Sequence, residues 1–134
     1  MGAPTGTAAT YASNLNSLLA GMIARTPGAV HAVMATVDGV QIAVSAGLPL
    51  ERADQLATIG AGLLSIADGA GIMMNTGTPR HVVVEMYGGL LLAMPVAPRV
   101  VLSLLAAHDA DRERLGFELA QFAGLITPHV THIR

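Results

Sequence analysis

The segment from Leu50 to Met74 carries apolar residues at helical spacing on two faces, and it contains no proline. At 3.6 residues per turn, the first apolar face comprises Ala53, Leu56, Gly60, Leu63, Ala67, Gly71 and Met74. The second apolar face comprises Ile59, Gly62, Ile66, Gly69, Ala70 and Met73. A helix on the surface of a small domain needs only one apolar stripe. The pattern therefore predicts one long helix that is covered once by its own sheet and once by another body.

Glycines stand at positions 60, 62, 69 and 71 of this predicted helix. Each of them destabilises a helix interior by about 1 kcal/mol relative to alanine. Glycine in such a place allows another backbone to approach closely. A fully buried central helix would also explain the pattern, but a chain of 134 residues surrounds a helix with difficulty. The pattern therefore favours an intermolecular contact.

The region before the central helix predicts a first helix and a β-hairpin. Apolar positions from Tyr11 to Ile23 fall on one helical stripe, and Thr26-Pro27-Gly28 ends it. Asp38-Gly39 is a two-residue turn signal within residues 29–46. Counted from this turn, three facing pairs are expected to share the core side of the sheet: Val37 with Val40, Ala35 with Ile42, and Val33 with Val44.

The region after the central helix predicts three strands and a last helix. Residues 80–87 and 90–95 flank Gly88-Gly89, a second two-residue turn signal, and residues 100–106 form a further apolar run. The last helix is expected to be capped by Asp109 or Asp111 and to end at Pro128. Its stripe comprises Leu115, Leu119, Phe122 and Ile126.

The predicted element order is α-β-β-α-β-β-β-α, which we interpret as an α+β fold. The short turns require antiparallel neighbours, so we expect a five-stranded antiparallel sheet with helices on both faces. We expect one domain over residues 11–128, a disordered lead-in over residues 1–10 and a frayed tail over residues 129–134.

Composition narrows the function classes. Apolar residues make up 52% of the chain and charged residues 12%, and this apolar excess favours a subunit interface. The net charge of -2, without a run of like charges, argues against nucleic-acid binding. The chain has no cysteine, which excludes thiolate chemistry and is compatible with a reducing cytoplasm. The longest apolar run, residues 90–97, is too short to span a membrane, so we expect a cytoplasmic protein.

The residues suggest no catalytic, cofactor or metal site. The sequence has no phosphate-binding G-x-x-x-x-G-K-[ST] motif, and its serines lack a G-x-S-x-G context. His129 and His132 have metal-ligand spacing but no acidic or thiol partner nearby in the sequence. We therefore expect an interaction protein and no enzyme.

The order and spacing of several short motifs resemble the bacterial branch of the roadblock/LC7 family, which includes dynein light chain roadblock-like proteins. The resemblance covers about residues 14–127. The motifs that carry it are Pro27-Gly28-Ala29-Val30-His31-Ala32-Val33, Asp38-Gly39, Arg52-Ala53-Asp54-Gln55-Leu56-Ala57, Gly62-Leu63-Leu64-Ser65 and Val84-Glu85-Met86 with Gly88-Gly89. Residues 96–99 depart from the Gly- and Asp-rich turn expected there, which puts the geometry of that turn in question.

The resemblance implies a dimer in which the second helices pack together and the third strands pair. It implies a dimer interface of Ile59, Gly62, Ile66, Gly69, Ala70, Met73, Val82 and Val84. It also implies a non-catalytic adaptor or regulator of a Ras-like small GTPase, with stimulated GTP hydrolysis left open and a sensor histidine kinase as a further partner.

The narrow polar face of the central helix offers candidate contacts for such a partner, although a solvated face has the same composition. These contacts are Asp54, Thr58, Ala61 and Ser65. Two alternatives stay open at this point: a small-molecule sensor, which needs a pocket between sheet and helix, and a purely structural scaffold.

Overall fold

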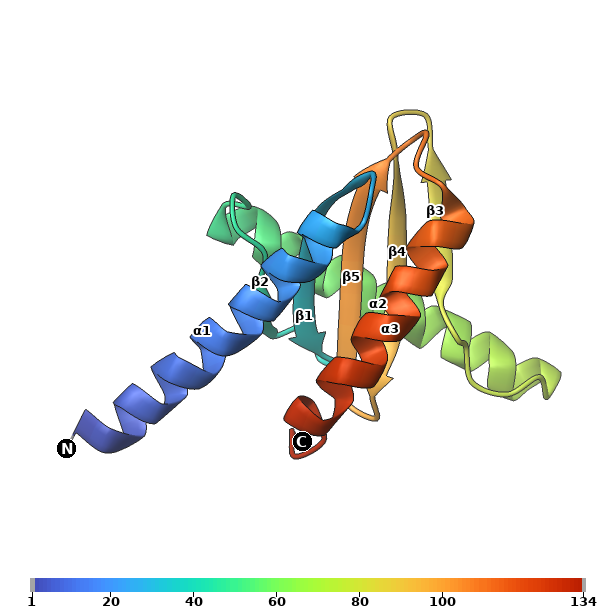
Figure 1. The fold of residues 1–134 in the computed structure, drawn as a ribbon. Coiled ribbons are helices and arrows are strands. Elements are labelled where there is room, and N and C mark those ends of the chain that lie inside the picture. The colour runs from blue at the N-terminus through green and yellow to red at the C-terminus, as the bar shows by residue number, and fades with distance from the viewer. Residues whose placement is uncertain (1, 134) are drawn as a thin grey trace.

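The computed structural model describes residues 2–133, with side chains described from residue 14 onward. Three helices and five strands follow one another in the predicted order α-β-β-α-β-β-β-α (Figure 1). The elements are α1 (Gly2–Arg25), β1 (Ala29–Thr36), β2 (Gln41–Val44), α2 (Leu50–Met74), β3 (Val82–Met86), β4 (Gly89–Ala97), β5 (Val100–Ala107) and α3 (Arg112–Val130).

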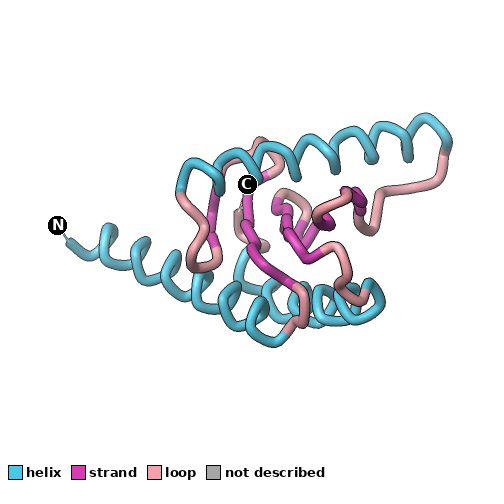
Figure 2. The backbone as a smooth tube through the Cα atoms, turned by 90° about the horizontal axis from the view of Figure 1, so that it is seen from above, coloured by secondary structure: helices cyan, strands magenta, loops and turns pink. Residues whose placement is uncertain are grey.

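The five strands form one antiparallel sheet in the order β2-β1-β5-β4-β3. Viewed from above, α2 lies on one face of the sheet, and α1 and α3 lie on the other (Figure 2). The predicted fold class, an α+β sandwich with helices on both faces, is confirmed.

The hydrophobic core is divided unequally by the sheet. The larger cluster lies between the sheet and the α1–α3 layer, where Leu15, Leu19 and Phe122 are almost fully buried. Two smaller clusters lie beneath α2 and include Val33, Ala53 and Leu64. Because α2 alone covers its face of the sheet, much of its own surface is left without a layer above it.

Both terminal helices extend beyond their predicted ends. The structure continues α1 over residues 2–10, where we expected a disordered lead-in; Pro4 stands in the first turn, where its missing N–H removes no helical hydrogen bond. The prediction that Pro128 ends the last helix is wrong, because α3 continues to Val130. The fully buried Val130 anchors the turn after Pro128, and Ile133 packs against the same cluster.

Both hairpins differ from the predicted register. In the first, Val33 faces Val44 as expected, but a bulge places Ala35 opposite Gln41 and turns Ile42 toward the larger cluster. The predicted pairing of Val37 with Val40 is also wrong, because the turn spans residues 37–40 and both side chains are exposed.

In the second hairpin, Met86 pairs with Gly89, so the turn residues are Tyr87 and Gly88. The turn therefore lies one residue earlier than the Gly88-Gly89 signal indicated.

Among the described helices, α2 is the one that is long and apolar enough to cross a membrane on length and composition alone. This differs from our expectation, which considered only uninterrupted apolar runs. In the structure α2 lies across its own sheet, and core helices of soluble proteins pass the same test. Its apolar excess is concentrated on the side that faces away from the sheet.

Candidate functional site

The sheet-facing side of α2 is lined with small residues that bring the helix close to the strands. The buried positions are Ala53, Leu56, Ala57, Gly60, Ala61, Leu64 and Gly71. A Cβ added at Gly60 would lie 2.9 Å from Ser103 Cβ on β5, and nearer still to its Oγ. This stripe is rotated slightly from the predicted one, because Leu63 and Ala67 are only half-buried and Met74 is exposed.

The opposite side of α2 is an apolar stripe that no described part of the chain covers. Its large members, Ile59, Ile66 and Met73, are 50%, 74% and 79% exposed. The smaller residues Gly62, Gly69 and Ala70 are also exposed, and all six were predicted interface residues. We call Ile59, Gly62, Ile66, Gly69 and Met73 the outer stripe.

The outer stripe alternates large and small residues at coiled-coil spacing. Successive members are three, four, three and four residues apart, which matches positions a and d of a heptad. The a positions hold Ile59, Ile66 and Met73, and the d positions hold Gly62 and Gly69. A Cβ added at either glycine meets nothing within 4 Å in the chain. Large side chains therefore alternate along the stripe with glycines, which leave space for a side chain of another molecule.

Strand β3 lies at an open edge of the sheet, with β4 as its neighbour (Figure 1). At the other edge, β2 has only four residues, and the Asn16 side chain of α1 accepts a hydrogen bond from the Val44 N–H. That contact blocks the β2 edge against a further strand. Val82 and Val84 are half-buried and pack beneath α2, whereas the side chains of Val83, Glu85 and Met86 are exposed.

The predicted partner face is only partly exposed. Asp54, Thr58 and Ser65 lie at the surface, but Ala61 is 7% exposed. Ala61 was therefore wrongly assigned as a contact, because the helix is rotated so that this position packs toward the strands.

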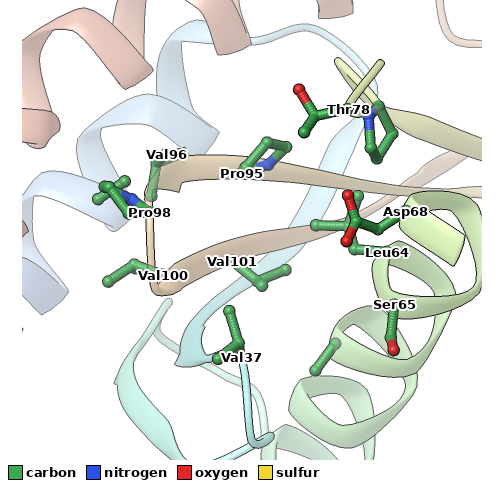
Figure 3. Close-up of a pocket in the computed structure, with 13 residues that line it drawn as sticks. Val37, Leu64, Ser65, Asp68, Thr78, Pro95, Val96, Pro98, Val100 and Val101 are labelled. Atoms are coloured by element: carbon green, nitrogen blue, oxygen red, sulfur yellow. The ribbon is translucent and has the colours of Figure 1, made fainter. Parts of the chain in front are cut away.

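Next to Ala61, a cavity of about 730 Å³ opens between α2 and the β4–β5 turn (Figure 3). Its walls come from α2, the segment before β3, the β4–β5 turn and the β1–β2 turn. The lining residues are Val37, Ala61, Leu64, Ser65, Asp68, Thr78, Pro79, Pro95, Val96, Ala97, Pro98, Val100 and Val101. Sequence reasoning missed this cavity, although the prolines at 79, 95 and 98 in the bounding segments were a signal of rigid, non-helical walls.

Acidic and imidazole side chains do not gather into a metal site. Within residues 2–133, no group of three or more His, Asp or Glu side chains is placed to hold an ion. An ion pair connects Glu85 on β3 to Arg112 at the start of α3, and both side chains are more than half exposed.

Comparison with known proteins agrees with this geometry. The model of the Roadblock/LC7 domain matches residues 15–106. A solved Roadblock/LC7 domain from Streptomyces avermitilis is 33% identical and covers 86% of this chain and 96% of its own, with a TM-score of 0.82.

Two more distant structures share the fold. MglB from Myxococcus xanthus is 14% identical, with coverages of 86% of this chain and 93% of its own and a TM-score of 0.75. Profilin IB from Acanthamoeba castellanii is 14% identical, with coverages of 84% and 96% and a TM-score of 0.61. No curated protein matches the chain. The family model and the Streptomyces domain show that the chain belongs to the Roadblock/LC7 domain family.

Proposed function

We propose that this chain is a homodimeric, non-catalytic adaptor that regulates a small Ras-like GTPase in the bacterial cytoplasm. The observation that carries the proposal is the uncovered outer stripe of α2, on a chain whose strand β3 also has an open edge. Soluble monomers rarely expose contiguous apolar surface of this kind, and such a surface marks an interaction site. Self-association accounts for the apolar character of α2 without membrane insertion.

The alternation along the outer stripe favours an antiparallel pair of α2 helices. In an antiparallel pair, a and d positions of the two helices share a layer, whereas parallel helices match a with a and d with d. In an antiparallel pair with its two-fold axis near residue 64, Ile66 would pack against Gly62 of the second copy. Ile59 would pack against Gly69 of that copy in the same way. Parallel packing would stack isoleucine on isoleucine and leave voids between glycines, so it is disfavoured.

An estimate of the association free energy indicates that packing of the two α2 helices alone gives only a weak dimer. A stable dimer therefore needs a second contact, through the sheet. Burying Ile59, Ile66 and Met73 contributes roughly 1–2 kcal/mol each, or about 10 kcal/mol over two copies. Association itself costs an estimated 4–15 kcal/mol, so this gain alone gives a weak dimer. Pairing β3 with β3 of the second copy would satisfy both open edges and extend the sheet to ten strands. Both contacts are the ones that the resemblance to the family implies.

Self-association also has a parallel among structural neighbours, since one solved MglB structure has a tetrameric arrangement. That protein is 14% identical to this chain, so it supports the shared fold and only suggests the assembly. The GTPase as partner is what the resemblance to the family implies, and family membership supports this part of the proposal. A sensor histidine kinase as a further partner stays a prediction of the resemblance alone.

A regulatory effect on the GTPase would come from ordering its switch loops. An adaptor that binds one nucleotide state more tightly shifts the partner's population toward that state. The exposed Asp54, Thr58 and Ser65 are the proposed contacts. Stimulated hydrolysis would then reflect the partner's own chemistry.

The test is binding of the purified chain to the small GTPase encoded nearest its gene, loaded with GDP or a GTP analogue, with hydrolysis followed alongside. Preference for one nucleotide state supports the adaptor function, and faster turnover adds an activating role. Failure of a folded dimer to bind either state would overturn the GTPase proposal and leave self-association to be judged by sedimentation.

A further inference from the structure

The cavity beside Ala61 has mostly apolar walls, since ten of its thirteen lining residues are apolar or proline. Leu64 on α2 packs against Val101 on β5, and Pro95 on β4 also lines the open space (Figure 3). A volume of about 730 Å³ falls within the range of known small-molecule sites. Because these walls are strand ends and a helix flank, the cavity is largely formed before anything binds.

Three polar side chains line the same cavity without a protein partner. Ser65 and Asp68 come from α2, and Thr78 comes from the segment before β3. None of the three side chains makes a hydrogen bond or ion pair with any described residue. A few polar groups among apolar walls are typical of a ligand site. A carboxylate beside apolar walls also gains from a cationic partner, because part of its hydration is lost there.

We propose that this cavity binds a small organic cation, namely an apolar body with a protonated amine that pairs with the Asp68 carboxylate. Asp68 is the one charged residue in the lining, so the cavity favours a positive ligand over a neutral or negative one. The hydroxyls of Ser65 and Thr78 line the cavity on either side of Asp68 (Figure 3). The apolar body would lie against the proline and valine walls.

The site is separate from the proposed dimer contact. Ser65 and Asp68 lie on the flank of α2 that borders the cavity, whereas Ile59, Ile66 and Met73 project from the side opposite the sheet. Ligand binding therefore does not require the outer stripe to be free. The inference stands whether or not the chain dimerises.

The experiment uses the full chain and 4-phenylbutylamine, with 4-phenylbutan-1-ol and 4-phenylbutanoate as neutral and anionic counterparts. Affinities come from ligand-observed NMR titration, and site assignment comes from amide shift changes. We expect the amine to bind about tenfold more tightly than the alcohol, since hydrogen bonds to charged groups are stronger than neutral ones. The carboxylate should bind more weakly than the alcohol.

Two variants and a matched control localise the effect. Asp68→Asn should reduce amine binding to the level of the alcohol, and Ser65→Phe should weaken both ligands by filling the mouth of the cavity. Asp109→Asn removes the same charge from an exposed position in the segment between β5 and α3, outside the cavity lining, and should leave both affinities unchanged. Circular dichroism melts verify that each variant is folded.

Equal affinity for amine, alcohol and carboxylate would overturn the proposal, because adsorption to the apolar stripe would explain it. The same conclusion would follow if folded Asp68→Asn kept the preference for the amine, or if shift changes mapped to the outer stripe. Sedimentation of the wild-type chain, with and without the amine, reports dimerisation separately, so failure of one proposal is distinguishable from failure of the other.

Discussion

Replacing Gly62 by leucine should strengthen the single chain and weaken its dimer. Gly62 is exposed, and a Cβ placed there meets nothing within 4 Å. Leucine is a better helix former than glycine by about 1 kcal/mol, and no clash in the chain offsets this gain. A monomer of Gly62→Leu is therefore expected to unfold at a higher temperature than the wild-type monomer.

In the proposed dimer, the same leucine would fill the space beside position 62 that Ile66 of the second copy occupies. Overpacking of a fitted interface costs about 1–3 kcal/mol per site, and two-fold symmetry repeats the clash. The combined loss is roughly 2–6 kcal/mol, which weakens the dissociation constant at least about thirtyfold. The gain in helix propensity is present in monomer and dimer alike, so it does not change the dissociation constant, and the two effects are measured separately.

Sedimentation velocity across a dilution series measures the dissociation constant, and thermal unfolding at the dilute end measures the monomer. Gly124→Leu is the matched control, because Gly124 is also an exposed helical glycine with open space around its Cβ but lies on α3 in the opposite layer. We expect it to leave the dissociation constant unchanged. If folded Gly62→Leu still sediments as a dimer at low micromolar concentration, the assigned interface is wrong.

Three further changes test the contacts of the single chain. Gly60→Ala should lower the unfolding free energy by about 1–3 kcal/mol through its clash with Ser103, and an unchanged urea midpoint would contradict the close approach. Asp111→Ala should lose about 1 kcal/mol, because the Asp111 carboxylate accepts the N–H hydrogen bonds that cap α3; calorimetry checks this, with Asp111→Asn as a control that keeps an accepting oxygen. Glu85→Gln should cost less than about 1 kcal/mol, with the difference vanishing at high salt, because its pair with Arg112 is exposed; a large, salt-independent loss of melting temperature would argue for a buried role.

The central helix was predictable in full because its signals are local. Pro49 precedes the first helical residue, Asn75 ends the helix in the left-handed conformation, and α2 runs over the predicted Leu50–Met74. The helical period of the apolar residues was also enough to distinguish the sheet-facing side of α2 from its outer side. The error at Ala61 corresponds to a small rotation of the helix about its own axis. That rotation depends on the strands beneath the helix, which the local sequence does not determine.

Features set by long-range contacts were not predictable. The bulge that turns Ile42 away from α2 depends on how β1 pairs with both β2 and β5. The continuation of α3 past Pro128 depends on the burial of Val130 in a distant core. The cavity is formed by four separate segments, so no single stretch of sequence indicates it.

The four glycines of α2 divide into two pairs with different physical reasons, and this division carries the argument for a second copy. Gly60 and Gly71 are required by the chain itself, since side chains there would collide with Ser103 and with the carbonyl of Gly77. Gly62 and Gly69 face open space. Together they destabilise α2 by about 2 kcal/mol relative to alanine, and no contact of a described residue at these positions offsets that loss. In the proposed dimer, a second backbone along the outer stripe would compensate for it, because glycine allows the close approach that packing of the isoleucines needs.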